Sequence, residues 1–547
     1  MTSRSTGLVR RMALATALAT AGLVATIGVA TSGSSTRLHL SDNVLLVGTF
    51  NGVKGQYTTI QAAVDAAQPG DTILVAPGDY HETGDAQNPP SGDRLNHGAF
   101  GAVYITTPDI TLRGMNRNTV IVDGTKAGAS ACSNKAADQT YGDVINGNAI
   151  GRNGIVVYDA DNVTIENLTT CNFLSGTEDS GNGVWWNGGE DTETIGLHGY
   201  TGEYLTATTT FFNGEQTAGT YGIFSSDAAG PGLWNTIYAS NQNDSGMYIG
   251  ACQNQCDSVV ENAWMEYNAL GYSGTNSGGS MVFKNSLFDN NEDGFDTNTQ
   301  IVGDPPAPQN GECPNNGTSP ITHTHSCWVV EDNTFENNNN PNTPRAGSAA
   351  AGPTGTGMTI SGGENDTVMN NTFINNGAWG ILFVPYPASS SLTGEYGQSC
   401  LGTGGFDNAL FGCVYDPKGD ALLNNTFVND GYYKNASNSD FGQITLSGNE
   451  PSNCFAGNKD PQGSAPANLE KVQPKCGVTT KAANTGGSLF TQVLCDTGYG
   501  GCTSAMKYPQ ATTVQIHALP PAKQLVTMPN PCVGVPTNAW CKAGKPI

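Results

Sequence analysis

The chain has 547 residues, of which 71 are glycine and only 13% are charged. Its formal net charge of −24 argues against nucleic-acid binding, which needs a basic surface, and disfavours long polyanionic substrates unless a bound cation or a local basic groove offsets the field. A content of 37% hydrophobic residues is too high for a disordered chain and, with so much glycine, favours short strands and tight turns.

The N-terminus has the composition of an export signal. Three arginines within the first eleven residues precede an apolar run from Met12 to about Ala30, which ends in small residues suited to cleavage. The alternative is a membrane anchor, but the run is rich in alanine and threonine and barely long enough to span a bilayer. We therefore expect residues 1–30 to be a signal peptide and the mature protein to be a secreted, extracellular monomer with no membrane association.

The cysteines agree with export, because an even number of them, 14, suits disulfide formation in an oxidising compartment. Ten are close to a partner in the sequence, which predicts disulfides that staple local loops. These neighbours are Cys252 and Cys256, Cys313 and Cys327, Cys400 and Cys413, Cys495 and Cys502, and Cys532 and Cys541.

The first predicted element is a short amphipathic helix from Tyr57 to Ala67, which ends at the following Pro-Gly pair. A strand then begins near Thr72 and contains a second Pro-Gly turn. The two segments read TIQAAVDAAQPGD and TILVAPGDYHE.

From there, glycines recur at a fixed period. The gaps between Gly222, Gly246, Gly271 and Gly294 are 24, 25 and 23 residues, as expected for a stack of similar units. A second signature, Asn-x-Phe-x-Asn-Asn and its variants, recurs beside the first. Asparagine tolerates left-handed turns and can hydrogen-bond along a stack, so we interpret these residues as structural.

The helix and strand motifs resemble the N-terminal cap and first coil of right-handed parallel β-helix proteins of the pectin-lyase-like superfamily, and the likeness extends over about residues 50–460. The resemblance implies an all-β fold, a single right-handed parallel β-helix over residues 31–460 with a capping helix. Residues 461–547 are then a cysteine-containing segment packed on or after the last coils. Because many unrelated activities share this scaffold, the resemblance says little about function.

Two breaks in the glycine period predict long loops. The glycine gaps of 63 residues after Gly294 and 62 residues after Gly380 place them at about residues 299–326 and 385–418, each with a cysteine pair. Long loops in a regular solenoid commonly border a binding face.

Strand alternation identifies which residues leave the stack. The residue after each repeat glycine is apolar and is predicted to point inward, so the next one points outward. In chain order these outward residues are Trp185, Phe224, Tyr248, Ser273, Asp296, Thr359 and Leu382. We predict Trp185, Phe224, Tyr248 and Ser273 to bind substrate, since flat aromatic faces beside polar groups suit sugar rings. Alternatively, the aromatic residues lie beneath a hairpin expected at residues 196–214 or beneath the long loops.

The aromatic row leads to an acidic run, which we interpret as the catalytic centre. Its Asn-Glu-Asp-Gly-Phe-Asp resembles the Asn-Thr-Asp-Gly-Phe-Asp motif of polygalacturonase-type glycoside hydrolases, in which the residue matching Asp293 is catalytic. That family's second carboxylate pair and uronate-binding cations are missing here, and the same run is also ordinary turn chemistry. A glycosidase needs two carboxylates. The predicted catalytic residues are Asp293, Asp296, Glu292 and Asp244.

Three functions remain open. The first is a hydrolase of neutral or weakly charged polysaccharide, the second a glycan-binding or cell-envelope protein without catalysis, and the third a Ca²⁺-assisted uronate lyase or epimerase. The lyase is disfavoured because Lys284 is the only lysine or arginine from Asn153 to Asn298. We expect no required cofactor, although the acidic run also offers oxygen ligands for Ca²⁺.

Overall fold

The computed structural model describes residues 43–84, 101–176, 180–189, 194–214, 217–300, 306–346, 349, 352–386, 404–408, 412–447, 452–476 and 487–547. The predicted signal peptide, parts of both long loops and Cys400 lie outside these residues. No described helix has the length and apolar character needed to cross a bilayer.

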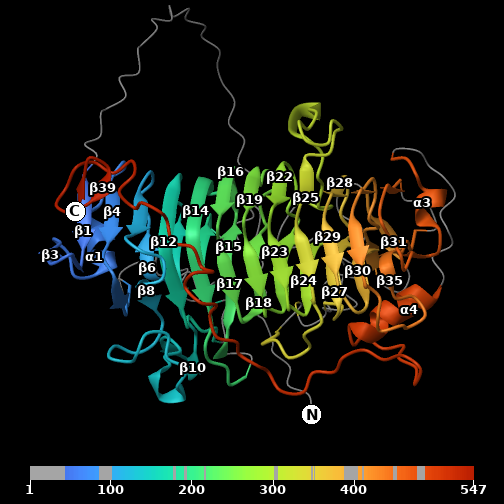
Figure 1. Cartoon of the computed structure of the whole chain (residues 1–547), viewed down its shortest axis with the longest axis horizontal. Coiled ribbons are helices and arrows are strands. Elements are labelled where there is room, and N and C mark those ends of the chain that lie inside the picture. Colours follow the sequence, from blue (N-terminus) through green and yellow to red (C-terminus); the bar gives the residue numbers. More distant parts are fainter. Residues whose placement is uncertain are drawn as a thin grey trace, which may run out of the picture. The chain divides into compact units, whose positions relative to one another are not determined.

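The described chain winds through successive coils whose strands pair in parallel, and it forms the predicted right-handed parallel β-helix (Figure 1). Eleven strands make the first sheet. They are β6 (Gly101–Ile105), β11 (Asn153–Tyr158), β13 (Val184–Asn187), β15 (Gly219–Ser226), β18 (Gln242–Ile249), β21 (Leu270–Thr275), β24 (Asp293–Asn298), β27 (Thr356–Ser361), β30 (Trp379–Val384), β35 (Ser439–Gln443) and β37 (Ser464–Ala465).

The other two faces form one continuous sheet of 20 strands, because β12 and β14 run through the corner between them. The second face contains β1 (Val44–Val47), β4 (Thr72–Val75), β7 (Thr111–Gly114), β12 (Val163–Cys171), β14 (Leu197–Thr208), β16 (Ala228–Asn235), β19 (Ser258–Glu261), β22 (Met281–Lys284), β25 (Trp328–Glu331), β28 (Asp366–Met369), β33 (Ala421–Leu423) and β36 (Cys454–Ala456). The third face contains β5 (Gly78–Tyr80), β8 (Val120–Asp123), the ends of β12 and β14, β17 (Tyr238–Ser240), β20 (Trp264–Glu266), β23 (Leu287–Asp289), β26 (Thr334–Glu336), β29 (Thr372–Ile374) and β34 (Thr426–Val428).

Short elements decorate the stack. The two-stranded antiparallel pairs are β2 (Thr49–Phe50) with β3 (Val53–Lys54), β9 (Val144–Ile145) with β10 (Asn148–Ala149), β31 (Phe406–Asn408) with β32 (Gly412–Val414), and β38 (Cys541–Lys542) with β39 (Lys545–Pro546). The helices are α1 (Ile60–Ala66), α3 (Leu469–Val472) and α4 (Gly487–Asp496), with single 3-10 turns at Ala136–Asp138 and Pro314–Asn316. The expected hairpin at residues 196–214 is wrong, because β14 is one long strand paired in parallel with both neighbours.

The predicted capping helix is confirmed as α1. Thr59 is its N-cap, and the Thr59 side chain accepts a hydrogen bond from the Ala62 amide at 3.4 Å. Ile60, Ala63 and Val64 are buried in the core that runs through the coils. The helix therefore closes the apolar end of the stack, as a solenoid requires.

The predicted inward row is confirmed by the strand register. Val184, Ile223, Met247 and Tyr272 are aligned on successive strands of the first sheet and are fully buried in the core. On the third face the corresponding inward position carries stacked phenylalanine rings 4.8–5.1 Å apart. Those rings belong to Phe288, Phe335, Phe373 and Phe427.

Asparagine side chains link the coils at both ends of the third-face strands. At one end, Asn371 Oδ1 accepts from the Asn333 backbone at 2.9 Å, and the Asn371 backbone donates to Asn425 Oδ1 at 2.9 Å. The residue directly before a ladder asparagine has the left-handed conformation that turns the chain. Asn370, which precedes Asn371, has φ 58°. The predicted structural role of the Asn repeat is confirmed.

Four of the predicted local disulfides are present: Cys252–Cys256, Cys313–Cys327, Cys495–Cys502 and Cys532–Cys541. Two further disulfides, Cys132–Cys171 and Cys454–Cys476, join residues 39 and 22 positions apart, and sequence spacing did not reveal them.

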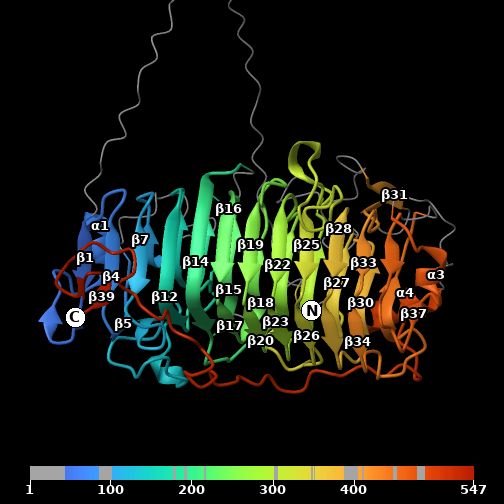
Figure 2. The same ribbon diagram turned by 45° about the horizontal axis from the view of Figure 1, so that its top comes forward.

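Residues 505–547, here called the C-terminal strap, run back along the stack from the last coils to the first (Figures 1 and 2). Lys507 contacts Asn435, His517 stacks on Tyr267 with ring centroids 3.6 Å apart, and the end of the strap reaches the first coil. There Cys532, Val535, Trp540 and Cys541 pack on Leu46, Leu74, Ala76 and Met115.

Candidate functional site

A cavity of about 380 Å³ lies on the outer side of the first sheet, over strands β18 to β30. Polar side chains from the strands form its floor, and apolar side chains from α4 and from the segment after β35 form much of its wall. The floor includes Asp244, Ser273, Asp296, Thr359 and Ser361. The apolar wall includes Ile444, Leu446, Phe490, Val493 and Leu494, and four tyrosines (Tyr221, Tyr248, Tyr386 and Tyr499) also line the cavity.

The outward row of the first sheet supplies this floor. Tyr248, Ser273 and Asp296 are register partners on β18, β21 and β24, in the order that the sequence predicts. Because adjacent strands lie about 4.8 Å apart, the row places a tyrosine, a serine and a carboxylate side by side.

The aromatic end of the row does not form an open platform, which corrects the prediction for two of its members. Trp185 is 0% exposed and Phe224 is 3% exposed, and their stacked rings lie 4.9 Å apart in an apolar cluster with Tyr104 and Val156. The Trp185 indole nitrogen donates to Ser226 Oγ at 3.0 Å. Only Tyr248, at 7% exposed, reaches the cavity. Burial thus removes Trp185 and Phe224 from substrate contact.

Asp244 is partly exposed on the cavity floor at the start of β18. Burial raises the pKa of Asp244 to about 7, and the nearby charge of Asp296 adds to that rise. Hydrogen bonds from the side chains of Ser245, Ser273 and Tyr221 oppose the rise by favouring the carboxylate. At mildly acidic pH this group therefore carries a proton within reach of a ligand.

Asp296 is the second partly exposed carboxyl group of the floor. Its Oδ1 accepts hydrogen bonds from Thr359 Oγ1 at 2.5 Å and from Ser361 Oγ at 2.8 Å, and its Oδ2 accepts from Asn298 Nδ2 at 3.1 Å. Burial raises the pKa of Asp296, and these three donors act against that rise. Asp296 thus accepts hydrogen bonds at both carboxylate oxygens, which favour its ionised form and fix its orientation.

Asp293 lies behind the floor and is fully buried, so the predicted direct catalytic contact is not supported for this residue. Asp293 Oδ1 accepts from the Phe295 amide at 3.2 Å, and Oδ2 accepts from Thr359 Oγ1 at 3.3 Å. Burial, followed by the charge of Asp296, raises the pKa of Asp293 well above its ordinary value. Asp293 thus contacts the floor only indirectly, through the Thr359 hydroxyl that it shares with Asp296.

Glu292 is also fully buried and does not line the cavity, which corrects its predicted catalytic role. Its Oε1 accepts hydrogen bonds from Arg345 Nη1 and from Thr354 Oγ1, the latter at 3.0 Å. Burial raises the pKa of Glu292 to about 8, although Arg345 opposes the shift. The residue anchors the segment between β26 and β27 against the stack.

The cavity wall was not predicted from the sequence. Helix α4 carries Leu489, Phe490 and Val493 at helical spacing, a signal that the glycine- and alanine-rich surroundings obscured. Gln492 fixes the helix to the last coils by accepting from the Ser437 amide at 2.9 Å and its hydroxyl at 2.7 Å. The Asp496 carboxyl group is buried near Glu292 and Arg345, and burial raises its pKa well above the ordinary value.

The carboxyl groups of the cavity floor are also possible ligands for Ca²⁺. Ca²⁺ takes oxygen ligands, and Asp244, Ser273 and Asp296 offer them, so the donor chemistry of the cavity fits this ion. Glu292 is committed to Arg345 and would not contribute.

No family model and no curated protein matches the chain. Among solved structures, the A-module of the mannuronan C-5 epimerase AlgE6 of Azotobacter vinelandii is similar at 14% identity over 74% of this chain and 90% of that one, with a TM-score of 0.40. A family 28 exopolygalacturonase of Yersinia enterocolitica is similar at 9% identity over 76% and 75%, with a TM-score of 0.40. The pectate lyase Pel9A is similar at 13% identity over 76% and 80%, with a TM-score of 0.36.

These values assign no activity to the chain. The coils, their parallel register and the capping helix define a right-handed parallel β-helix protein, which is the fold that the sequence motifs imply.

Proposed function

We propose that the chain is a secreted, polysaccharide-active enzyme that hydrolyses a glycosidic bond in the cavity over β18 to β30. The observation that carries this proposal is the pair Asp244 and Asp296, both partly exposed on one cavity floor with Ser273 between them. Glycoside hydrolysis needs two carboxyl groups, one as proton donor and one as base or nucleophile.

Asp244 is the proton donor in this proposal. Its pKa of about 7 keeps it protonated in mildly acidic solution, so that it can protonate the leaving-group oxygen. Asp296 is the base, because its three hydrogen-bond donors favour the ionised form and fix its orientation. Asp293 and Thr359 position Asp296.

The spacing of the two groups favours inversion of the anomeric centre. Asp244 and Asp296 belong to strands two coils apart, and Asp244 precedes Tyr248, the residue of β18 that is aligned with Ser273 and Asp296, so their backbones lie further apart than the about 10 Å of two strand spacings. A wide separation leaves room for a water molecule between the base and the sugar, whereas a retaining pair is about 5 Å apart.

The substrate is a neutral or weakly charged glycan. None of the described residues that line the cavity is a lysine, arginine or histidine, so nothing there balances a uronate carboxylate. The tyrosines and apolar wall provide surfaces for sugar rings. The same absence of cationic side chains means that a lyase or epimerase here would depend on bound Ca²⁺ to balance its uronate substrate.

The test is a glycan panel scored for binding and product release, with D244N, D296N and a control, D289N. Asp289 belongs to the same acidic run but lies on the third face, where Trp264 Nε1 donates to it at 2.7 Å. We expect D244N and D296N to lose about 10²–10⁴-fold in turnover and D289N to keep it. D244N should recover activity on aryl glycosides, whose leaving groups need no proton, whereas D296N should not.

Product analysis separates the alternatives. Nuclear magnetic resonance of the first product should show inverted configuration at a saturated reducing end. Unsaturated products would support the lyase, and binding without product release by the wild-type protein would support a non-catalytic glycan-binding protein. Unchanged turnover in both D244N and D296N would refute the assignment of these two residues.

A further inference from the structure

A second cluster of metal-ligand residue types lies on the first coils, away from the strands of the cavity. Asp79 is in β5, His81 follows that strand, and Asp123 ends β8. The two strands pair in parallel, with Asp79 aligned to Ile121 and Tyr80 to Val122, so the next aligned pair is His81 and Asp123. Each of the three residues offers one ligand atom, and these atoms lie within 4.8 Å of one another.

The histidine in this cluster has a defined orientation. His81 Nδ1 lies 2.9 Å from the Thr125 carbonyl oxygen, which can only accept a hydrogen bond, so Nδ1 carries the proton. In the neutral ring, Nε2 is then unprotonated and presents its lone pair to Asp79 Oδ2, which lies 3.3 Å away. Two acceptors at this distance repel each other unless a cation, either a proton or a metal ion, lies at Nε2. Metal-binding histidines are commonly oriented by such a second hydrogen bond.

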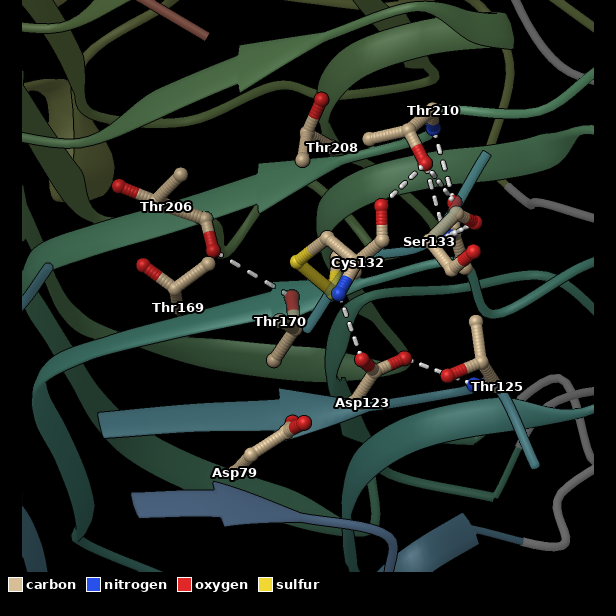
Figure 3. Close-up of a disulfide and its surroundings, with 12 residues drawn as sticks. Asp79, Asp123, Thr125, Cys132, Ser133, Thr169, Thr170, Thr206, Thr208 and Thr210 are labelled. Carbon is tan, nitrogen blue, oxygen red and sulfur yellow. Dashed lines mark hydrogen bonds between the residues drawn. A yellow bond between two sulfur atoms is a disulfide. The ribbon is translucent and has the colours of Figure 1, made fainter. Parts of the chain in front are cut away.

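The carboxyl group of Asp123 is held in place by the backbone. It is fully buried, its Oδ1 accepts from the Thr125 amide at 2.7 Å, and its Oδ2 accepts from the Cys132 amide at 2.6 Å. The Cys132–Cys171 disulfide, drawn in yellow in Figure 3, fastens Cys132 to Cys171 at the end of β12. Each Asp123 oxygen keeps a further lone pair, so the group can also bind a metal ion.

The side chain of Thr125 provides an independent sign of a ligand. Thr125 is 2% exposed, and its hydroxyl oxygen has no hydrogen-bond partner in the described structure. Figure 3 shows this oxygen turned toward the Asp123 carboxylate. A buried hydroxyl without a partner is costly, and a water molecule on a metal ion at this place would satisfy it.

Asp79 gives the cluster access to solvent. It is the exposed member, whereas His81 is half-buried. The two carboxylates of the cluster repel each other at this separation, and a divalent cation between them would relieve that repulsion. The cysteines beside the cluster are oxidised and cannot act as thiolate ligands.

We propose that Asp79, His81 and Asp123 bind a divalent transition-metal ion. His81 Nε2 and one oxygen from each aspartate are the protein ligands, and water completes the coordination. An imidazole among carboxylates suits Zn²⁺ or Mn²⁺ better than Ca²⁺ and Mg²⁺, which prefer oxygen ligands alone. Since the ligands lie on β5 and β8, the ion joins two consecutive coils next to the capping helix.

The test uses the full chain after removal of metals with a chelator. Zn²⁺ is titrated by calorimetry and by thermal unfolding into the wild type, H81A, D79N and the control H198A. His198 also faces a carboxylate, with Nδ1 3.9 Å from Asp161 Oδ1, but both side chains are largely exposed. The control thereby removes a histidine–aspartate pair without removing the proposed site.

We expect H81A and D79N each to weaken Zn²⁺ binding at least tenfold and to abolish the Zn²⁺-dependent rise in Tm, while H198A matches the wild type. Ca²⁺ at the same concentration should give no rise. Asp79 is exposed, so D79N tests the site even if H81A folds poorly. Equal Zn²⁺ affinity in D79N, H198A and the wild type, or no binding by the wild type, would overturn the proposal and leave a plain His81–Asp79 ion pair.

Discussion

Single carboxyl groups in this acidic protein keep their protons far above the pH at which free aspartate and glutamate lose them. Burial raises the pKa of Asp244, Glu266, Asp430 and Asp440 to about 7 and that of Glu292 to about 8. Each group therefore binds more proton in the folded than in the unfolded chain at intermediate pH. The stability that these groups contribute is complete below about pH 4 and is lost as the pH rises through 7 to 8.

We accordingly predict that the protein is most stable in mild acid. Tm should fall by roughly 5 °C or more between pH 5 and pH 8, because several buried carboxyl groups must ionise in the folded state. E292Q cannot ionise and should reduce that difference. Scanning calorimetry of the wild type and E292Q at both pH values measures it, and a Tm that rises toward pH 8 would contradict the prediction.

At the scale of elements, the asparagine ladder joins strands that the backbone alone would connect only by sheet hydrogen bonds. Asn371 is in the middle of one ladder, where Oδ1 accepts from the Asn333 amide at 2.9 Å and Nδ2 donates to the Val330 carbonyl at 2.8 Å. Both partners are buried. If the side-chain amide of Asn371 is removed, the Asn333 amide and the Val330 carbonyl lose these hydrogen bonds, and no water can replace them in the buried interior.

N371A should therefore lower the free energy of unfolding by about 3 kcal/mol, since two or more buried polar groups lose their partners. N370G is the matched control: Asn370 has φ 58°, which glycine accepts, and its side chain is exposed. Denaturant unfolding with tryptophan fluorescence compares the two variants. Equal midpoints would show that the ladder adds nothing beyond the sheet.

The regular elements could be predicted because each coil repeats the same local rules. The glycine period and alternation gave the correct register from Val184 to Leu382, since adjacent parallel strands must align their apolar residues. The repeated Asn-Asn sequences likewise predicted both the left-handed turns and the hydrogen bonds between coils. The hairpin expected at residues 196–214 was wrong because a glycine-rich polar stretch can also continue a strand around a corner.

The site was only partly predictable, because its walls come from segments far apart in the sequence. The positions of Asp296 and Ser273 followed from register, but the burial of Trp185 depends on what covers the sheet, which alternation does not reveal. Helix α4 lies nearly 200 residues after Asp296 in the chain. Likewise, the Asp79, His81 and Asp123 cluster depends on a pairing of strands about 40 residues apart.

At the scale of the whole molecule, the C-terminal strap covers what the first coils would otherwise expose. Its Trp540 packs in the apolar cluster on Leu46 and Leu74, and its indole nitrogen donates to the Val53 carbonyl at 2.9 Å. Arg113 of β7 donates to the Val533 carbonyl at 2.8 Å. The strap thus contributes apolar burial at the opposite end of the stack from α4.

A chain that ends at Ser504 should keep its central coils but lose protection in the first ones. We expect faster hydrogen exchange over β1 and β4, a lower Tm and binding of a hydrophobic dye, because the cluster around Leu46 becomes exposed. K523A, an exposed change within the strap, serves as the control. Unaltered exchange in β1 of the truncated chain would show that the strap does not stabilise that end.

The strap also affects the order in which the protein can finish folding. Asn51 Nδ2 donates to the Ile547 carbonyl at 2.7 Å, a contact between residues 496 positions apart. At a synthesis rate of about 5–20 residues per second, the first coil waits about 25–100 s for this partner. Most solenoids can grow from one end as each repeat is completed. Here the first coil becomes fully native only when the strap has been synthesised, so closure of that coil is a late and long-range step.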